Sequence, residues 1–157
     1  MKESDSIEAG SAIIPPFDSP LGKLGMMICF DLRFPEIALA LKRQEADVLL
    51  YPSAFTPATG KAHWHALLCA RAIETECWVI AAAQVGAHNQ KRSSYGHSVV
   101  ISPWGQIMGE LGGPEDKEQK GDDWEPELLT VDVDLEVARR MRREVPLKRR
   151  TDVYPEV

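Results

Sequence analysis

The chain has 157 residues, of which 44% are hydrophobic and 27% are charged, a composition typical of one folded domain. Its formal net charge of −6 argues against general affinity for nucleic acid. No apolar run approaches the length of about 18 residues that a membrane span needs, so no membrane partner is expected. The odd number of cysteines, without a secretory signal, favours a reducing compartment. We therefore expect a cytoplasmic location, with a mitochondrial one as the alternative.

The first part of the sequence predicts a βαβ unit. Residues 1–20 are rich in Ser, Asp, Glu and Pro and are predicted as a surface arm. An apolar run of strand length follows at 24–30, a helical period at 34–44 and a second strand at 46–51. A strand, a helix and a strand in this short a stretch predict a parallel pair.

The rest of the sequence predicts one long helix, further strands and a final helix. A helical period covers 62–76, strands are expected at 78–83, 97–101, 106–111 and 128–133, and a helix at 134–143. Loops are predicted at 53–60, 86–94 and 112–126. The later strands follow one another too closely for helical crossovers, so they should pair antiparallel. The expected fold class is α/β with a mixed sheet, as one domain over residues 1–157. The strands are apolar almost throughout, so something besides the few helices should cover the second face of the sheet.

Cys29 lies where the first buried strand gives way to a helix. Pro35 marks the first turn of that helix, where a missing N–H costs nothing. Such a turn holds a side chain at the rim of a sheet beside backbone N–H groups, which suits a nucleophile and its oxyanion hole. The alternative is a structural cysteine, because free cysteine is among the most buried residue types. Cys69 and Cys77 have apolar neighbours in a helical stretch and are interpreted as packing residues.

Several sequence blocks resemble the nitrilase, or carbon–nitrogen hydrolase, superfamily, and they occur in the family's order. The blocks are ICFDLRFPE (28–36), YPSAF (51–55), HW (63–64) with ARAIET (70–75), SYGHS (94–98) and PWG (103–105). The tail at 142–146 and 150–154 also resembles the Nit amidase branch. The resemblance implies a four-layer αββα sandwich with two sheets inside. This chain would form its C-terminal half, which would explain the sheet face that lacks cover.

The resemblance implies cysteine-dependent hydrolysis of non-peptide amides, with deaminated glutathione or a related omega-amide as the expected substrate. The cysteine attacks the carbonyl carbon, the nitrogen leaves, and water cleaves the thioester. By position, Cys29 matches the nucleophile, and the backbone N–H of Phe30 would stabilise the oxyanion. The family's substrate-positioning glutamate is carried onto Glu3. Arg33 and Glu36, at i and i+3, are expected to orient groups near the site. Candidate pocket walls follow the second strand, at Ser53, Ala54 and Phe55.

The sequence also departs from the family pattern. A general-base glutamate and a lysine belong well before the cysteine, and neither motif precedes Cys29 here, so the chain is expected to start just after the lysine motif. His65 stands where the family usually has an acid, and Cys69 where it usually has arginine. Arg71 and Glu74 are interpreted as a structural ion pair. The histidines at 63, 88 and 97 do not show metal-ligand spacing, and no metal or cofactor is expected.

These observations leave three hypotheses. The first is a Nit-type amidase that takes a small amide substrate. The second is a catalytically inactive form that lacks the upstream glutamate and lysine and acts only as an oligomer partner. The third is a structural α/β domain with a redox-reactive Cys29. An apolar sheet face without cover predicts association, and a homo-oligomer is the expected form.

Overall fold

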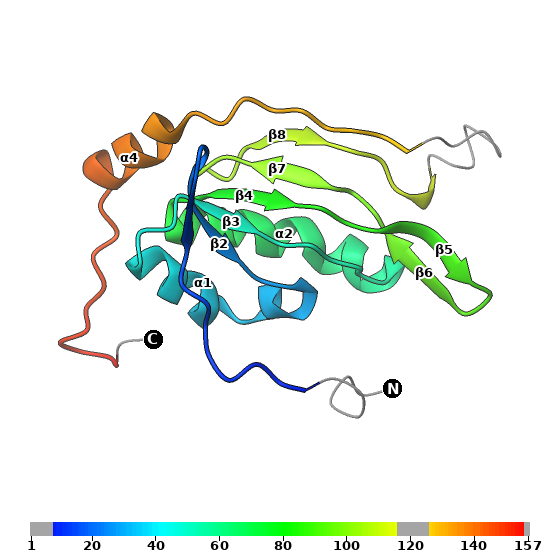
Figure 1. Cartoon of the computed structure of the whole chain (residues 1–157), viewed down its shortest axis with the longest axis horizontal. Helices are drawn as coiled ribbons and strands as arrows, with labels where there is room; N and C mark the ends of the chain where they lie inside the picture. Colours follow the sequence, from blue (N-terminus) through cyan, green and yellow to red (C-terminus); the bar gives the residue numbers. More distant parts are fainter. Residues whose placement is uncertain (1–7, 116–125, 156–157) are drawn as a thin grey trace.

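The computed structural model describes residues 8–115 and 126–155, so the predicted site residue Glu3 lies outside the described residues. Its main element is a six-stranded mixed sheet of order β1-β2-β3-β4-β7-β8 (Figure 1). The strands are β1 (Phe17–Ser19), β2 (Gly22–Met26), β3 (Val48–Leu50), β4 (Trp78–Ala81), β7 (Val99–Ile101) and β8 (Ile107–Glu110). Strands β2, β3 and β4 pair in parallel, and β4–β7 and β7–β8 pair antiparallel. This confirms the predicted mixed α/β sheet.

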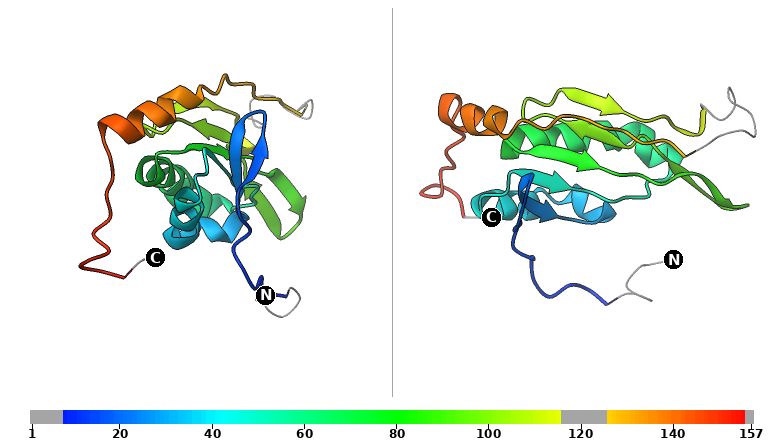
Figure 2. Two further views of the ribbon diagram at one scale, coloured as in Figure 1. Left: turned by 60° about the vertical axis from the view of Figure 1, so that its left-hand side comes forward. Right: turned by 45° about the horizontal axis from the view of Figure 1, so that its top comes forward.

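The helices α1 (Pro35–Arg43) and α2 (Pro57–Thr75) pack together on one face of the sheet (Figures 1 and 2). A short 3-10 helix, η2 (Cys29–Arg33), connects β2 to α1. Their apolar sides form one core cluster with β3 and β4, centred on Leu41, Leu49, Trp64, Leu68 and Val79. The amphipathic pattern at 34–44 therefore predicted α1 closely. None of the helices in the described part of the chain combines the length and the apolar character of a membrane span.

The second face of the sheet is covered in part by the C-terminal segment. Residues 129–137 form a second core cluster with Val48, Trp78 and Val100. The predicted strand at 128–133 is wrong, because this segment pairs with no strand of the described residues. The alternation was nevertheless informative: odd-numbered residues from 129 to 133 are half-buried and even-numbered ones are exposed. The segment runs extended along the sheet to α4 (Leu135–Glu144), which Asp134 caps by accepting from Glu136 N–H at 2.9 Å.

Other predictions were wrong, two of them near the candidate site. The predicted loop at 86–94 contains a two-stranded antiparallel hairpin, β5 (Val85–Asn89) and β6 (Arg92–Tyr95), which extends from one end of the molecule (Figure 1). Its residues are mostly polar and exposed, so no apolar alternation marked it. The long helix begins at Pro57 rather than 62. The local signal was present, since Thr56 caps the helix and proline at the first helical position is favoured.

Candidate active site

Cys29 lies at the carboxyl end of β2, at the edge of the sheet where ligands bind in open α/β folds. Its backbone has a φ of +41°, a left-handed conformation that is strained for a residue with a side chain. The Cys29 N–H donates to Pro52 O at 3.0 Å, which ties the turn to the chain that leaves β3. The cysteine itself is half-buried. The structure therefore presents this thiol on a sharp strand-to-helix turn.

The next backbone N–H, that of Phe30, is the candidate oxyanion donor. On either side of it, Cys29 N–H donates to Pro52 O and Asp31 N–H donates to Ile28 O at 2.8 Å. Among the hydrogen bonds of the described residues, none uses the Phe30 N–H. The Asp31 carboxylate accepts from Ile28 N–H at 2.8 Å, which closes the turn reciprocally. A donor beside the Cys29 thiol is thus left available.

Arg71 fixes η2 to α2. Its side chain is 5% exposed, and one guanidinium nitrogen donates to Leu32 O at 2.8 Å. The other donates to Glu74 Oε1 at 2.8 Å, so the predicted ion pair is confirmed. The contact with Leu32 O could not be foreseen, because it joins residues far apart in the sequence. Through it, Arg71 holds the short helix that begins at Cys29.

Arg33 and Glu36 do not share a helix face. Phe34 between them is extended, with φ −114° and ψ 101°, so Arg33 ends η2 and Glu36 lies in the first turn of α1. The i,i+3 relation therefore does not apply. The Arg33 guanidinium lies 5.4 Å from the Phe55 ring centroid, and its Nη1 is 3.3 Å from His63 Nδ1. Glu36 is exposed.

The three predicted wall residues face different surroundings. Ser53 is 8% exposed; its hydroxyl donates to Tyr51 O, and its N–H donates to Ala82 O at 2.8 Å. Phe55 is 6% exposed and packs on Trp64, with ring centroids 5.0 Å apart. Ala54 is exposed and lines a cavity.

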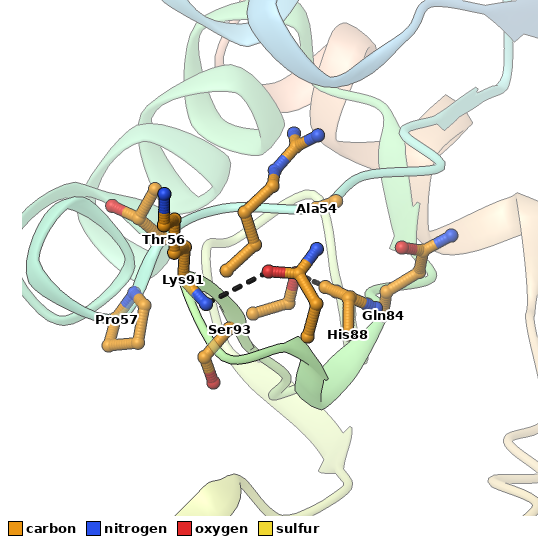
Figure 3. Close-up of a pocket in the computed structure, with 10 residues that line it drawn as sticks. Ala54, Thr56, Pro57, Gln84, His88, Lys91 and Ser93 are labelled. Carbon is orange, nitrogen blue, oxygen red and sulfur yellow. Dashed lines mark hydrogen bonds between the residues drawn. The ribbon is translucent and has the colours of Figure 1, made fainter.

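This cavity has a volume of about 430 Å³ and lies between the start of α2 and the β5–β6 hairpin (Figure 3). Its lining comes from two stretches, Ala54, Thr56 and Pro57 on one side and Gln84, His88, Asn89, Lys91, Arg92, Ser93 and Ser94 on the other. Apart from Ala54, these residues were not predicted as site residues. No periodic signal marked a hairpin at 86–94, and the hairpin supplies most of the residues on the second side.

A second polar cluster lies on the far side of Tyr95. Glu110 Oε1 is 2.8 Å from His65 Nε2 and 2.7 Å from His97 Nδ1. These are metal-ligand types, and their ligand atoms lie within 4.8 Å of one another. Both imidazoles face the same carboxylate oxygen, so hydrogen bonding by itself accounts for the arrangement. The other histidines named in the sequence lie elsewhere: His63 beside Arg33, and His88 with Nε2 2.7 Å from Ser94 Oγ.

The fold and the thiol at a strand-to-helix turn define a class, that of α/β proteins with a candidate nucleophilic cysteine at the edge of the sheet. The family model described as carbon-nitrogen hydrolase matches residues 1–143, and the chain belongs to this family.

The relatives place the chain in the Nit branch of the nitrilase superfamily. It is 47% identical to the probable hydrolase nit2 of Schizosaccharomyces pombe, over 100% of this chain and 54% of that protein. It is 46% identical to the deaminated glutathione amidase of Homo sapiens, over 98% of this chain and 44% of that protein. The crystal structure of the C. elegans NitFhit protein superimposes with a TM-score of 0.84 at 43% identity, covering 98% of this chain and 35% of that one. The chain thus spans about half the length of these relatives or less. Their names give no support to the hypothesis of an inactive oligomer partner.

Proposed function

We propose that this chain carries the nucleophile and part of the substrate pocket of an amidase that hydrolyses deaminated glutathione. The observation that carries the proposal is the strained turn at Cys29, with the Phe30 N–H beside it free of other described partners. Support for the substrate comes from the 46% identity to the human protein named for that activity.

In the proposed reaction, the Cys29 sulfur forms a bond to the carbon of the substrate amide. The carbonyl oxygen gains negative charge, which the Phe30 N–H stabilises; one such donor typically contributes about 3–4 kcal/mol. The carbon–nitrogen bond then breaks, and the nitrogen takes a proton and leaves as cysteinylglycine. Water hydrolyses the thioester, which releases 2-oxoglutarate and restores the thiol. The general-base and lysine roles of the family are assigned to no residue of this chain.

The test follows from the chemistry of the leaving group. Deaminated glutathione has no amino group, whereas cysteinylglycine has one, so an amine-reactive probe reports turnover directly. We expect Cys29→Ala to reduce turnover by at least about 10³-fold, because the nucleophile is lost. Cys69→Ala should stay within about threefold of the parent, because that thiol lies on α2 and has no role in the proposed chemistry.

Two outcomes would contradict the proposal. Turnover that survives Cys29→Ala would remove Cys29 from the nucleophile role. No turnover by the folded chain, combined with rapid alkylation of Cys29, would favour the hypothesis of a structural domain with a redox-reactive thiol.

We also propose that the chain self-associates, because large hydrophobic side chains stay exposed in the described structure, among them Ile73 (46%) and Trp104 (57%). Sedimentation equilibrium of the chain tests this, and a concentration-independent monomer mass would overturn it. A cytoplasmic location is likewise proposed, and cell fractionation tests it.

A further inference from the structure

The cavity beside Ala54 carries positive charge on its hairpin side. The cations Lys91 and Arg92 line it, and among the described residues no aspartate or glutamate belongs to its lining. Neither Lys91 nor Arg92 forms an ion pair with another described residue. The cavity therefore selects for an anionic ligand group.

The rest of the lining is neutral and capable of hydrogen bonding. Thr56, Gln84 and Ser93 contribute hydroxyl and amide groups. The hairpin turn is braced internally, since the Asn89 side-chain oxygen accepts from Lys91 N–H at 2.9 Å (Figure 3). A volume of about 430 Å³ is in the range of small-molecule sites. The cavity thus has the size, the donors and the charge to bind a carboxylate and the short chain attached to it.

This cavity lies close to Cys29. Cys29 N–H donates to Pro52 O, and Ala54, which lines the cavity, is two residues further along the chain. Two residues span at most about 7 Å. Gln84 N–H also donates to Ser53 O at 2.9 Å, which joins the hairpin side to the same stretch. The stretch from Pro52 to Ala54 therefore connects the turn at Cys29 to the lining of the cavity, and the proposal below needs an arm of about two residues between the reacting carbon and the bound carboxylate.

We propose that the cavity binds the leaving dipeptide of the substrate, with Lys91 and Arg92 pairing with its terminal glycine carboxylate. This inference rests on the proposed function. Cysteinylglycine is two residues long, which matches the length of the arm, and it ends in a carboxylate, which matches the positive charge of Lys91 and Arg92. The other carboxylate of deaminated glutathione belongs to the acyl half, on the opposite side of the scissile bond. The hairpin is thereby a specificity element for peptide amides that end in a carboxylate.

The test compares two ligands in matched variants. The ligands are deaminated glutathione and its glycinamide analogue, in which the glycine carboxylate is a neutral amide. The variant is Lys91→Met with Arg92→Met. The control is Lys148→Met with Arg149→Met, which removes the same two charges from another exposed Lys–Arg pair. Binding is measured by calorimetry in the Cys29→Ala background, where no turnover is expected, and KM and kcat are measured with Cys29 present.

The parent chain should bind the acid about tenfold more tightly than the glycinamide, because a charge-assisted hydrogen bond is lost with the carboxylate. The variant at Lys91 and Arg92 should lose this preference. With Cys29 present, it should raise KM for deaminated glutathione about tenfold and change kcat less than about threefold. The control at Lys148 and Arg149 should keep the preference.

Failure of the inference and failure of the proposed function give different results. An active parent whose preference for the acid survives Lys91→Met with Arg92→Met overturns the inference alone. A parent that binds with this preference but releases no amine supports the cavity and overturns the activity. A parent that neither binds nor turns over deaminated glutathione overturns both.

Discussion

The three cysteines lie in different environments. Cys29 is half-buried on its turn, and Cys69 is partly buried on α2. Cys77 is fully buried between α2 and β4, where its thiol donates to Ala46 O at 3.1 Å. Burial raises the pKa of Cys69, and burial raises that of Cys77 against the opposing effect of Arg142. Both thiols therefore stay protonated at neutral pH, in agreement with the packing role predicted for them.

The raised pKa of Cys77 has a consequence for stability at high pH. The unfolded thiol ionises near its ordinary pKa of 9.0, while the folded thiol keeps its proton. The stability that is fully present below pH 9.0 is therefore lost as pH rises above it, by up to about 1.4 kcal/mol per pH unit. We expect the unfolding free energy of Cys77→Ala to fall less steeply than that of the parent between pH 9.0 and about pH 10 in urea titrations. Equal slopes would show that Cys77 ionises alike in both states.

At the scale of elements, the first turn of α2 is packed against the hairpin. A Cβ added at Gly60 would lie 2.2 Å from Cγ of Tyr95 in β6. Alanine is the better helix former by about 1 kcal/mol, yet we expect Gly60→Ala to lower the unfolding free energy by about 2–3 kcal/mol. The control is Ala62→Gly, two residues on and exposed, which should cost only about 1 kcal/mol. A stabilised Gly60→Ala variant in thermal unfolding would contradict this packing.

The η2 helix depends on one buried side chain from α2. Replacing Arg71 by methionine removes the donor to Leu32 O, so we expect a loss of about 2–3 kcal/mol of unfolding free energy. Glu74→Gln keeps that donor and alters a partner that is 31% exposed, so it should cost less than about 1 kcal/mol. Urea unfolding of the two variants measures the difference. Similar losses in both would mean that the ion pair, rather than the bond to Leu32 O, holds η2.

The elements that could be predicted from the sequence are those with a periodic apolar side. The helical period of α1 is produced by burial of one side against the first core cluster, and the apolar runs of β3 and β4 by burial of both strand faces in the two clusters. The β5–β6 hairpin has no such core, and its polar residues look like a loop. The segment at 128–133 was predicted as a strand but is not one, because its side-chain burial alternates without backbone pairing.

The candidate site follows the same division. The place of Cys29 at a strand-to-helix turn could be predicted because an apolar run, a cysteine and a helix start are local signals. The cavity could not, because its two sides come from 54–57 and 84–94 and meet only in the folded chain. The contact between Arg71 and Leu32 O escaped prediction for the same reason. Features set by neighbouring residues could be predicted from the sequence, whereas contacts between residues far apart in the sequence could not.

At the scale of the whole molecule, Arg142 of α4 binds residues that directly precede β3 and β4. Arg142 donates to Ala46 O at 2.7 Å and to Cys77 Sγ at 3.3 Å, and its Nη1 is 3.5 Å from Asp47 Oδ1. Ala138 and Met141 supply the buried apolar side of the helix. This small contact closes the second face of the sheet at that end.

We expect Arg142→Met to release α4 without unfolding the sheet. Amide hydrogen exchange across residues 135–144 should accelerate about tenfold, because a lost buried contact of this kind lowers local stability by about 1–2 kcal/mol. Arg139→Met is the control, since its ion pair with Glu136 joins side chains that are 51% and 61% exposed. It should change exchange less than about twofold. Uniform acceleration over β3 and β4 in Arg142→Met would instead mean that α4 and the sheet open together.

The left-handed backbone at position 29 lowers the stability of the fold, whereas the proposed reaction requires a cysteine at this position. Glycine adopts a φ of +41° without the steric cost that a side chain carries, typically about 1 kcal/mol or more. In a library of variants selected for thermal stability alone, glycine or asparagine should therefore become enriched at position 29. If Cys29 is the nucleophile that we propose, selection that also demands turnover should retain the cysteine and accumulate compensating substitutions elsewhere. Sequencing the two populations would distinguish these outcomes.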